Sequence, residues 1–240
     1  DKTQLAAAVE YLQEQAEISG MQSNLTLWLP VLPEILYLQD LAGAEKHIFQ
    51  REWQNQPNGQ EWELSGLVGL CDDPVNQSQT PIGVNFATDG HLAVCGMVVS
   101  GKSTFLQTLL FSLVNRYSPE AVNFYILDYS SRMLGCFKEL KHCGGIAFED
   151  QADRTGKLFS MLKRELERRK KLFEGGNYAQ YIRTHGACEP AVLLVIDGFA
   201  NFKEKTDNKY EDILIELSRE GANYGVFLVL SAGGFGISEI

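Results

Sequence analysis

The chain has 240 residues, of which 45% are hydrophobic and 22% are charged, and its formal net charge at pH 7 is −10. This composition is typical of a globular protein and excludes a chain that is disordered throughout. The negative charge provides no overall positive field for nucleic acid or anionic lipid, so such a role needs a local basic patch. The five cysteines contain no CxxC pair, which favours reduced thiols in a cytosolic setting over a disulfide framework.

Residues 1–60 are predicted to form an extension made of a helix and a linker. Thr3 can cap a helix that runs to Ser19, because apolar residues recur there every three or four positions. In the following segment, 28–41, aliphatic residues alternate with prolines, which break a helix and favour an extended connector. The chain shows no signal peptide, and its apolar runs fall short of the roughly 20 residues that span a bilayer. We therefore expect a soluble stretch, and the abrupt end at Ile240 suggests a piece of a longer protein.

Residues 61–240 are predicted to form one α/β domain. Short apolar runs alternate with segments of helical periodicity at 102–117, 151–173 and 209–222. The later apolar runs are continuous β-branched or aliphatic stretches, as expected when a sheet is covered on both faces. The sequence therefore predicts a mostly parallel sheet with helices on both faces; its apolar runs are 67–70, 82–86, 92–95, 122–127, 192–196 and 226–230.

The clearest motif is Gly-Met-Val-Val-Ser-Gly-Lys-Ser-Thr, which matches the phosphate-binding pattern GxxxxGK[ST]. A short apolar run precedes it and a helical segment follows it, as the pattern requires. Its two glycines let backbone N–H groups turn toward phosphate oxygens, and the following helix offers free amides and the positive end of its dipole. We therefore predict a P-loop NTPase fold that binds ATP through Gly96, Met97, Val98, Val99, Ser100, Gly101, Lys102, Ser103 and Thr104.

Individual residues of this loop have distinct expected roles. Lys102 adds a mobile cation for the phosphates, and Ser103 offers its hydroxyl to a bridging Mg²⁺ ion. Thr104 is expected either to support the start of the helix or to touch the α-phosphate. Val98 and Val99 stand at the tip, where β-branched residues tolerate positive φ poorly, which predicts a stiffer or differently curved loop.

A second strand supplies a carboxylate for the same metal ion. Residues 191–196 form an apolar run that ends at Asp197, the form of a Walker-B segment whose acid holds Mg²⁺ through water. We predict Ser103 and Asp197 as the Mg²⁺ site; the alternative for Asp197 is the cap of a following turn. Asp128 ends the run 122–127 in the same way, and a ligand role and a turn role both stay open for it.

The residue after Asp197 is Gly198, where many ATP-hydrolysing motors place a Glu that polarises the attacking water. Glu204 and Asp207 follow, but their spacing does not direct either of them into the site. We therefore predict nucleotide binding with slow or absent hydrolysis and assign no catalytic residue.

Residues 153–174 form the one basic patch, with eight Lys or Arg residues against four acids. A solvated or subunit-facing surface explains it, and so does a contact with nucleic acid or nucleotide phosphate. After the last apolar run, the glycine-rich stretch 231–236 predicts a flexible loop near the site.

Together with Leu-Val-Gly-Leu-Cys-Asp-Asp-Pro-Val-Asn-Gln at 67–77 and Trp-Leu-Pro-Val-Leu-Pro-Glu at 28–34, these motifs resemble the FtsK/SpoIIIE-type ATPase modules of the type VII secretion family EssC/YukB/EccC. The resemblance covers nearly the whole chain and implies a RecA/FtsK-like fold. It identifies 96–104 as Walker A, Asp197 as the Walker-B acid and Asp128 as the second-strand acid.

Several departures from the family pattern accompany this resemblance. Val98 and Val99 replace residues that are often Pro and Gly, Gly198 replaces Glu, and Ala222 stands where many relatives have Arg. The segment 72–77 most resembles a middle module. The resemblance therefore implies a degenerate middle module, which binds nucleotide while another module hydrolyses it. Family members usually continue with further strands, so the resemblance also implies a module truncated at Ile240.

The resemblance also implies cofactors, partners and location. ATP and Mg²⁺ are the expected cofactors; neighbouring ATPase modules of the same chain and WXG100-type export proteins are the expected partners, with a hexamer in the full machine. The machine lies at the cytoplasmic face of the cell membrane, to which this stretch makes no direct contact. Nucleic acid is not expected as a partner. Two alternatives are a DNA-translocating FtsK-type module and a nucleotide-free structural docking domain.

Overall fold

The computed structural model describes residues 3–21, 29–44, 53 and 61–234. The chain divides into two compact units, Asp1–Ile35 with Cys71–Thr80 and Leu36–Leu70 with Pro81–Ile240. Residues 36–44 and 53 therefore share a unit with residues 61–70, whereas the sequence predicts a boundary at residue 60. The boundary between a linker at 1–60 and an ATPase domain at 61–240 stays a prediction.

The first unit contains the predicted N-terminal helix, α1 (Gln4–Ile18). Thr3 caps it as expected, because its hydroxyl accepts the Ala6 N–H at 3.3 Å. No residue of α1 is buried. Residues 29–35 of the predicted connector form no helix or strand, and the Leu29 N–H donates to Gln77 Oε1 at 3.3 Å. Trp28, the start of that connector, lies outside the described residues.

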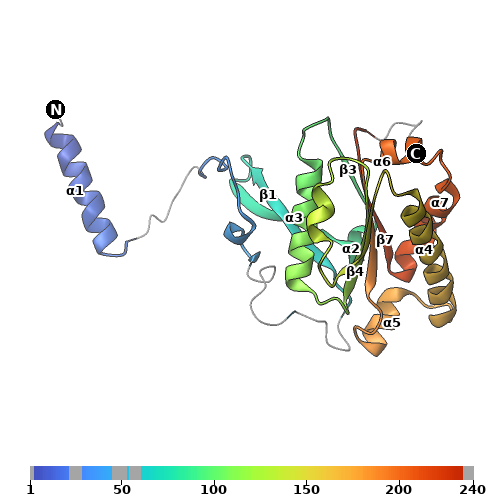
Figure 1. The fold of residues 1–240 in the computed structure, drawn as a ribbon. Helices are drawn as coiled ribbons and strands as arrows, with labels where there is room; N and C mark the ends of the chain where they lie inside the picture. The colour runs from blue at the N-terminus through green and yellow to red at the C-terminus, as the bar shows by residue number, and fades with distance from the viewer. Residues whose placement is uncertain (1–2, 22–28, 45–52, 54–60, 235–240) are drawn as a thin grey trace. The chain divides into compact units, whose positions relative to one another are not determined.

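The second unit is built on a five-stranded sheet in which every neighbouring pair is parallel. The strand order is β3-β7-β6-β4-β5, so the strand before the P-loop motif and the strand ending in Asp197 are separated by β7 alone. This confirms the predicted parallel sheet, which runs through the centre of the domain in Figure 1. The strands are β3 (Leu92–Cys95), β4 (Val122–Asp128), β5 (Cys143–Phe148), β6 (Ala191–Asp197) and β7 (Val226–Ala232).

The remaining described elements are a second sheet and several helices. Among the described residues, no helix is both long and apolar enough to cross a bilayer. A separate two-stranded sheet consists of β1 (Ser65–Asp73) and β2 (Ser78–Asn85). The α-helices are α2 (Phe86–Asp89), α3 (Lys102–Arg116), α4 (Ala152–Leu172), α5 (Tyr178–His185), α6 (Phe199–Lys205) and α7 (Glu211–Glu220), and the 3₁₀ helices are η1 (Leu38–Asp40), η3 (Met133–Phe137) and η4 (Gly221–Tyr224).

Strand β6 shows why both faces of the sheet are covered. Leu193 and Val195 belong to a core cluster with α3 and α5, whereas Leu194 and Ile196 belong to a second cluster with α4, α6 and α7. Since successive side chains of a strand point to opposite faces, a strand between two helical layers is apolar throughout. Figure 1 shows α3 on one side of the sheet and α4 and α7 on the other.

One strand was not predicted from the sequence. The edge strand β5 contains Gly144 and Gly145, which interrupt the apolar pattern that identified the others. An alanine-sized side chain at Gly144 would overlap the ring of Tyr125 on the neighbouring strand β4. Glycine therefore lets that ring lie against the strand backbone. The same glycines remove the apolar pattern by which a strand is predicted from the sequence.

Candidate functional site

The loop between β3 and α3 has the geometry of an anion-binding turn. Gly101 is the N-cap of α3 with φ of 88°, and a Cβ there would meet no atom within 4 Å. The Phe105 N–H donates to the Gly101 carbonyl at 2.8 Å, so the amides of residues 102–104 precede the helical ladder. Those amides and the helix dipole fit a phosphate group at this end of α3.

Lys102 reaches back across the loop. Its Nζ donates to the carbonyl oxygens of Gly96 and Met97, each at 2.7 Å. At the base of the loop, the Gly96 N–H donates to the carbonyl of Ala232 on β7 at 3.2 Å. The cation is thus held at the mouth of the loop, next to the amides that would receive a phosphate.

Ser103 and Asp197, predicted as a pair, lie in contact. Ser103 Oγ donates to Asp197 Oδ2 at 2.7 Å, and the side chain of Ser231 hydrogen-bonds to Asp197 Oδ1. Asp197 is only 1% exposed. Within the described part of the chain, no backbone N–H donates to its carboxylate, so the turn-capping alternative is not what the structure shows. A hydroxyl beside a carboxylate is an oxygen donor set that fits Mg²⁺.

Asp128 lies next to Asp197 but is differently engaged. The two residues are register partners at the carboxyl ends of β4 and β6. Asp128 Oδ1 accepts the N–H groups of Ser130 and Arg132 at 3.1 and 3.0 Å, and Oδ2 accepts that of Leu134 at 3.1 Å. Of the two roles left open by the sequence, the geometry favours the turn role, because the carboxylate is committed to backbone donors.

Gly198 begins the turn after β6 with φ of 81°. A Cβ at this position would lie 2.9 Å from the carbonyl oxygen of Tyr129, closer than real Cβ contacts. A side chain at this position would therefore need both a positive φ and a shift of the neighbouring backbone. Glu204 and Asp207 are exposed, and no hydrogen bond or ion pair joins either side chain to the site among the described residues.

Sequence reasoning missed the role of Ser231. It was placed in a glycine-rich loop after the last strand, but β7 continues through Ala232, because Val94 and Cys95 of β3 pair with Ser231 and Ala232. The fully buried Ser231 hydroxyl accepts the Gly198 N–H at 3.0 Å. A serine at the end of a strand carries no distinctive pattern, and only its neighbours in space identify it. Residues 235 and 236 of the predicted loop lie outside the described residues.

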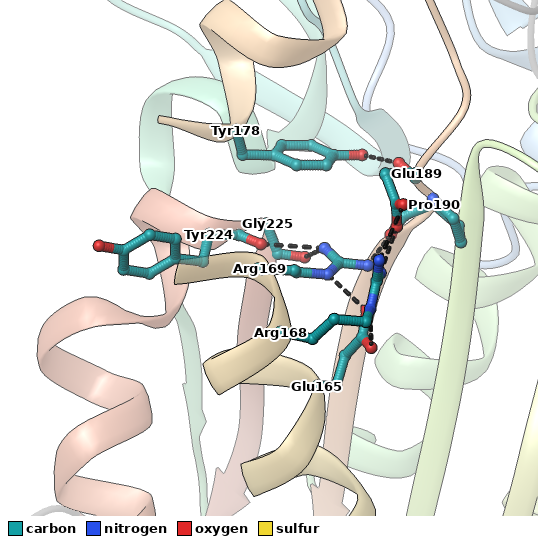
Figure 2. A network of polar contacts seen from close by, with 8 residues as sticks. All are labelled: Glu165, Arg168, Arg169, Tyr178, Glu189, Pro190, Tyr224 and Gly225. Atoms are coloured by element: carbon teal, nitrogen blue, oxygen red, sulfur yellow. Dashed lines mark hydrogen bonds and ion pairs between the residues drawn. The ribbon is translucent and has the colours of Figure 1, made fainter. Parts of the chain in front are cut away.

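The basic segment 153–174 is largely α4, and Figure 2 shows that Arg168 and Arg169, near the end of this helix, are paired within the fold. Arg168 donates to Glu165 and Glu189, and the 1%-exposed Arg169 donates to Glu165 and to the carbonyls of Pro190, Tyr224 and Gly225. The hydrogen bonds that Glu165 accepts from Arg168, together with those from Arg169, lower the pKa of Glu165 to about 2. These cations stabilise the junction of α4, β6 and β7 and are not displayed for a ligand.

An apolar pocket of about 140 Å³ lies between α6 and α7, apart from the P-loop. Most of its lining is aromatic or aliphatic: Phe199, Phe202, Tyr210, Leu214, Leu228 and Leu230 contribute to it. Lys203 and Glu211, also in the lining, lie 3.8 Å apart as an ion pair. Such a recess fits an apolar side chain of a docking segment better than it fits a phosphate.

Comparison with known proteins points to one family. The model of the FtsK/SpoIIIE family matches residues 44–234. A type VII secretion system protein EssC of Staphylococcus aureus is 28% identical over 235 residues, which are 96% of this chain and 15% of that protein. An ESX secretion system protein EccC of Geobacillus thermodenitrificans is 27% identical over 96% of this chain and 15% of its own length. The chain thus spans about 15% of the length of these relatives.

Solved structures agree with this assignment. The cytoplasmic domain of the Thermomonospora curvata type VII secretion ATPase EccC superposes with a TM-score of 0.76 and 30% identity, over 89% of this chain and 26% of that one. ATPases 2 and 3 of the same EccC, solved with a signal sequence peptide, give a TM-score of 0.68 and 32% identity over 76% of this chain and 35% of that one.

Proposed function

Because the chain belongs to the FtsK/SpoIIIE family, we propose that it is a nucleotide-binding module of a type VII secretion motor with weak or no hydrolysis of its own. The observation that carries the proposal is the 2.7 Å hydrogen bond between Ser103 Oγ and Asp197 Oδ2, which joins the start of the P-loop helix to the strand-end acid. These are the two protein groups that a nucleotide-bound Mg²⁺ requires.

Each predicted loop residue has a place in this proposal. The backbone of 96–104 surrounds the phosphates, and Lys102 moves from the Gly96 and Met97 carbonyls to phosphate oxygens. Mg²⁺, when bound, neutralises phosphate charge and fixes the phosphates against the protein. Ser103 would be its direct ligand and Asp197 its partner through water, while Ser231 orients the Asp197 carboxylate.

Slow or absent hydrolysis follows from the residues around Gly198. Attack by water needs a base within hydrogen-bond reach of it. Gly198, the position where that base is expected, has a positive φ, and the Tyr129 carbonyl oxygen lies in the space that a side chain would enter, which supports this part of the proposal. The proposed module therefore binds ATP and reports its presence to neighbouring modules without consuming it.

Calorimetry with Mg²⁺ and ATP, together with phosphate release, tests this function in the native chain and in Lys102→Ala. We expect binding in the native chain, its loss in the variant, and no phosphate release in either. Lys205→Ala is the matched control, because Lys205 is exposed on α6 and outside the loop. Absence of binding in the native chain would mean that the P-loop is vestigial, and turnover of several ATP per second would contradict a degenerate site.

The cargo of the motor would be a WXG100-type protein with a C-terminal signal. A signal sequence peptide was solved with ATPases 2 and 3 of the T. curvata EccC. The apolar pocket between α6 and α7 would receive an apolar side chain of such a segment. Titration of the chain with a cargo signal peptide tests this role. Leu214→Asp, at the pocket wall, should weaken binding, whereas Ile18→Asp on the exposed α1 should not.

The proposal also covers the setting of the module. Residues 1–60 would serve as its N-terminal helix and inter-module linker, and 61–240 as the ATPase domain, a degenerate middle module. Its partners would be neighbouring modules of one membrane-anchored chain, within a hexamer at the cytoplasmic face of the membrane. Sedimentation of the full-length protein with and without ATP would test that assembly.

Two alternative functions remain to be tested. A DNA-translocating module needs a basic channel, but Arg168, Arg169 and Lys170 of α4 are paired with acids inside the fold. Salt-dependent binding of duplex DNA at low ionic strength would favour this alternative. A nucleotide-free docking domain would show no ATP binding in the calorimetry above.

A further inference from the structure

Val99, at the tip of the P-loop, has a backbone conformation that its side chain opposes. Its φ is 64°, in the left-handed region, which β-branched residues adopt rarely and at a cost. The other described non-glycine residues with positive φ are all unbranched at Cβ: Gln77, Arg132, Glu174, Asp207 and Asn208. Val99 is therefore the outlier among them.

Packing does not compensate for this conformation. The Val99 residue is 97% exposed, so its side chain buries no surface that would hold the backbone in place. The loop is held instead by polar contacts on either side, from Lys102 Nζ to the Gly96 and Met97 carbonyls and from the Ser100 N–H to the Met97 carbonyl at 3.2 Å. None of these contacts is made by Val99 itself.

The strained conformation is the one that can bind an anion. Successive residues of opposite backbone hand turn their N–H groups to one side and form a concave anion site. Val99 and Gly101 have positive φ and Ser100 between them does not, so residues 99–101 have this alternation. If residue 99 relaxes to negative φ, the alternation is lost. The apparent nucleotide affinity is then the affinity of the competent loop multiplied by the fraction of molecules that have that loop conformation.

We propose that Val99 is an affinity-determining residue of this P-loop, whose disfavoured left-handed backbone keeps the affinity for nucleoside triphosphate below that of a loop with glycine at this position. The proposal rests on the function proposed above. The conformational cost of an L-residue in this region corresponds to roughly 5- to 30-fold in population. The cost arises from the Cβ atom and its branching against the local backbone, and not from contacts of the exposed side chain with other residues.

Three single variants distinguish the effect of positive φ at residue 99 on ATP binding from the effects of loop flexibility and side-chain size. Val99→Gly removes the cost of positive φ, which outweighs the added freedom of glycine, and should tighten Mg²⁺-ATP binding about fivefold in calorimetry. Val98→Gly adds the same freedom at a residue that is 90% exposed but lacks positive φ, and should weaken binding about two- to fivefold. Val99→Ala removes the branch but keeps the Cβ atom, and should tighten binding by less than Val99→Gly does.

The outcomes distinguish this inference from the proposed function. Opposite shifts in the two glycine variants support the inference, as does binding that appears only in Val99→Gly and disappears when Lys102→Ala is added. Equal shifts in both glycine variants, or an equal gain in Val99→Ala, would overturn the inference while leaving the proposed function intact. No binding in the native chain or in any variant would overturn both.

Discussion

Ser103 Oγ and Asp197 Oδ2 lie 2.7 Å apart although 94 residues separate them in the chain. The contact arises because β3 and β6 both pair with β7, so that their carboxyl ends open on the same edge of the sheet. A ligand between the ends of these strands therefore meets a helix N-terminus from one side and a carboxylate from the other.

The first prediction concerns the metal at this edge. Asp197→Asn keeps the shape of the side chain but removes its charge, so it should weaken Mg²⁺-dependent ATP binding about tenfold, as loss of an outer-shell carboxylate does. Calorimetry with Mg²⁺ and again with EDTA measures the metal-dependent part. The two conditions should converge in the variant, and an undiminished effect of Mg²⁺ would remove Asp197 from the metal site.

The second prediction separates Asp128 from Asp197. Asp128→Ala leaves the N–H groups of Ser130, Arg132 and Leu134 without their acceptor, and should lower the free energy of unfolding by about 2 kcal/mol in urea titrations. Asp150→Ala is the control, because its side chain is 61% exposed and its carboxylate forms a surface ion pair with Arg132. If Asp128→Ala changed the Mg²⁺ dependence of ATP binding without loss of stability, the carboxylate would be a ligand and not a turn cap.

The third prediction is that Gly198→Glu does not restore ATP hydrolysis. The new side chain would need a positive φ and a Cβ 2.9 Å from the Tyr129 carbonyl oxygen. Gly175 provides a matched comparison, because its φ is 87° and a Cβ there would meet nothing within 4 Å.

Both Gly198→Ala and Gly175→Ala should cost about 1 kcal/mol through backbone conformation, with a further loss for Gly198→Ala from the overlap. Urea unfolding of the two alanine variants measures that difference. Phosphate release by Gly198→Glu at native stability would show that the turn adapts and that the missing base alone limits the site.

The sequence predicted the structure correctly where a motif requires one particular local conformation. GxxxxGK[ST] dictates a turn and a helix start, so the loop at 96–104 was predicted, and the Walker-B form of 191–197 predicted the pairing of Ser103 with Asp197. The apolar runs likewise predicted the central strands, because a doubly covered strand has no polar face.

Other features depend on neighbours that sequence order does not reveal. Ser231 joins the site only because β7 lies between β3 and β6, and a single serine signals nothing by itself. Asp128 and Asp197 end similar strands, and their different roles depend on which backbone N–H groups the following loop presents. The charge of α4 predicted a solvated or subunit-facing surface or a phosphate contact, and not the internal network of Arg169, because acceptors such as the Tyr224 carbonyl are distant in sequence.

The last prediction tests the network in Figure 2 through its pH dependence. Hydrogen bonds from Arg168 and Arg169 lower the pKa of Glu165 from 4.5 to about 2. Because the folded-state pKa lies below the unfolded value, the stabilisation is present above pH 4.5 and is lost as the pH falls toward about 2. Glu165→Gln should therefore be less stable than the native chain at pH 7, by about 3 kcal/mol, because Arg169 is left buried without its acid.

Urea unfolding at pH 7 and at pH 3 measures both parts of this effect. The stability difference between Glu165→Gln and the native chain should shrink at pH 3, because the unfolded chain then carries a proton on Glu165 that folding must release. Glu167→Gln is the control on the same helix. The Glu167 side chain is 52% exposed, and its carboxylate lies 3.4 Å from Lys170 Nζ, so this surface ion pair contributes little to stability. A difference between Glu165→Gln and the native chain that is equal at the two pH values would mean that the amide fails through geometry, and that the charge of Glu165 does not hold Arg169 in place.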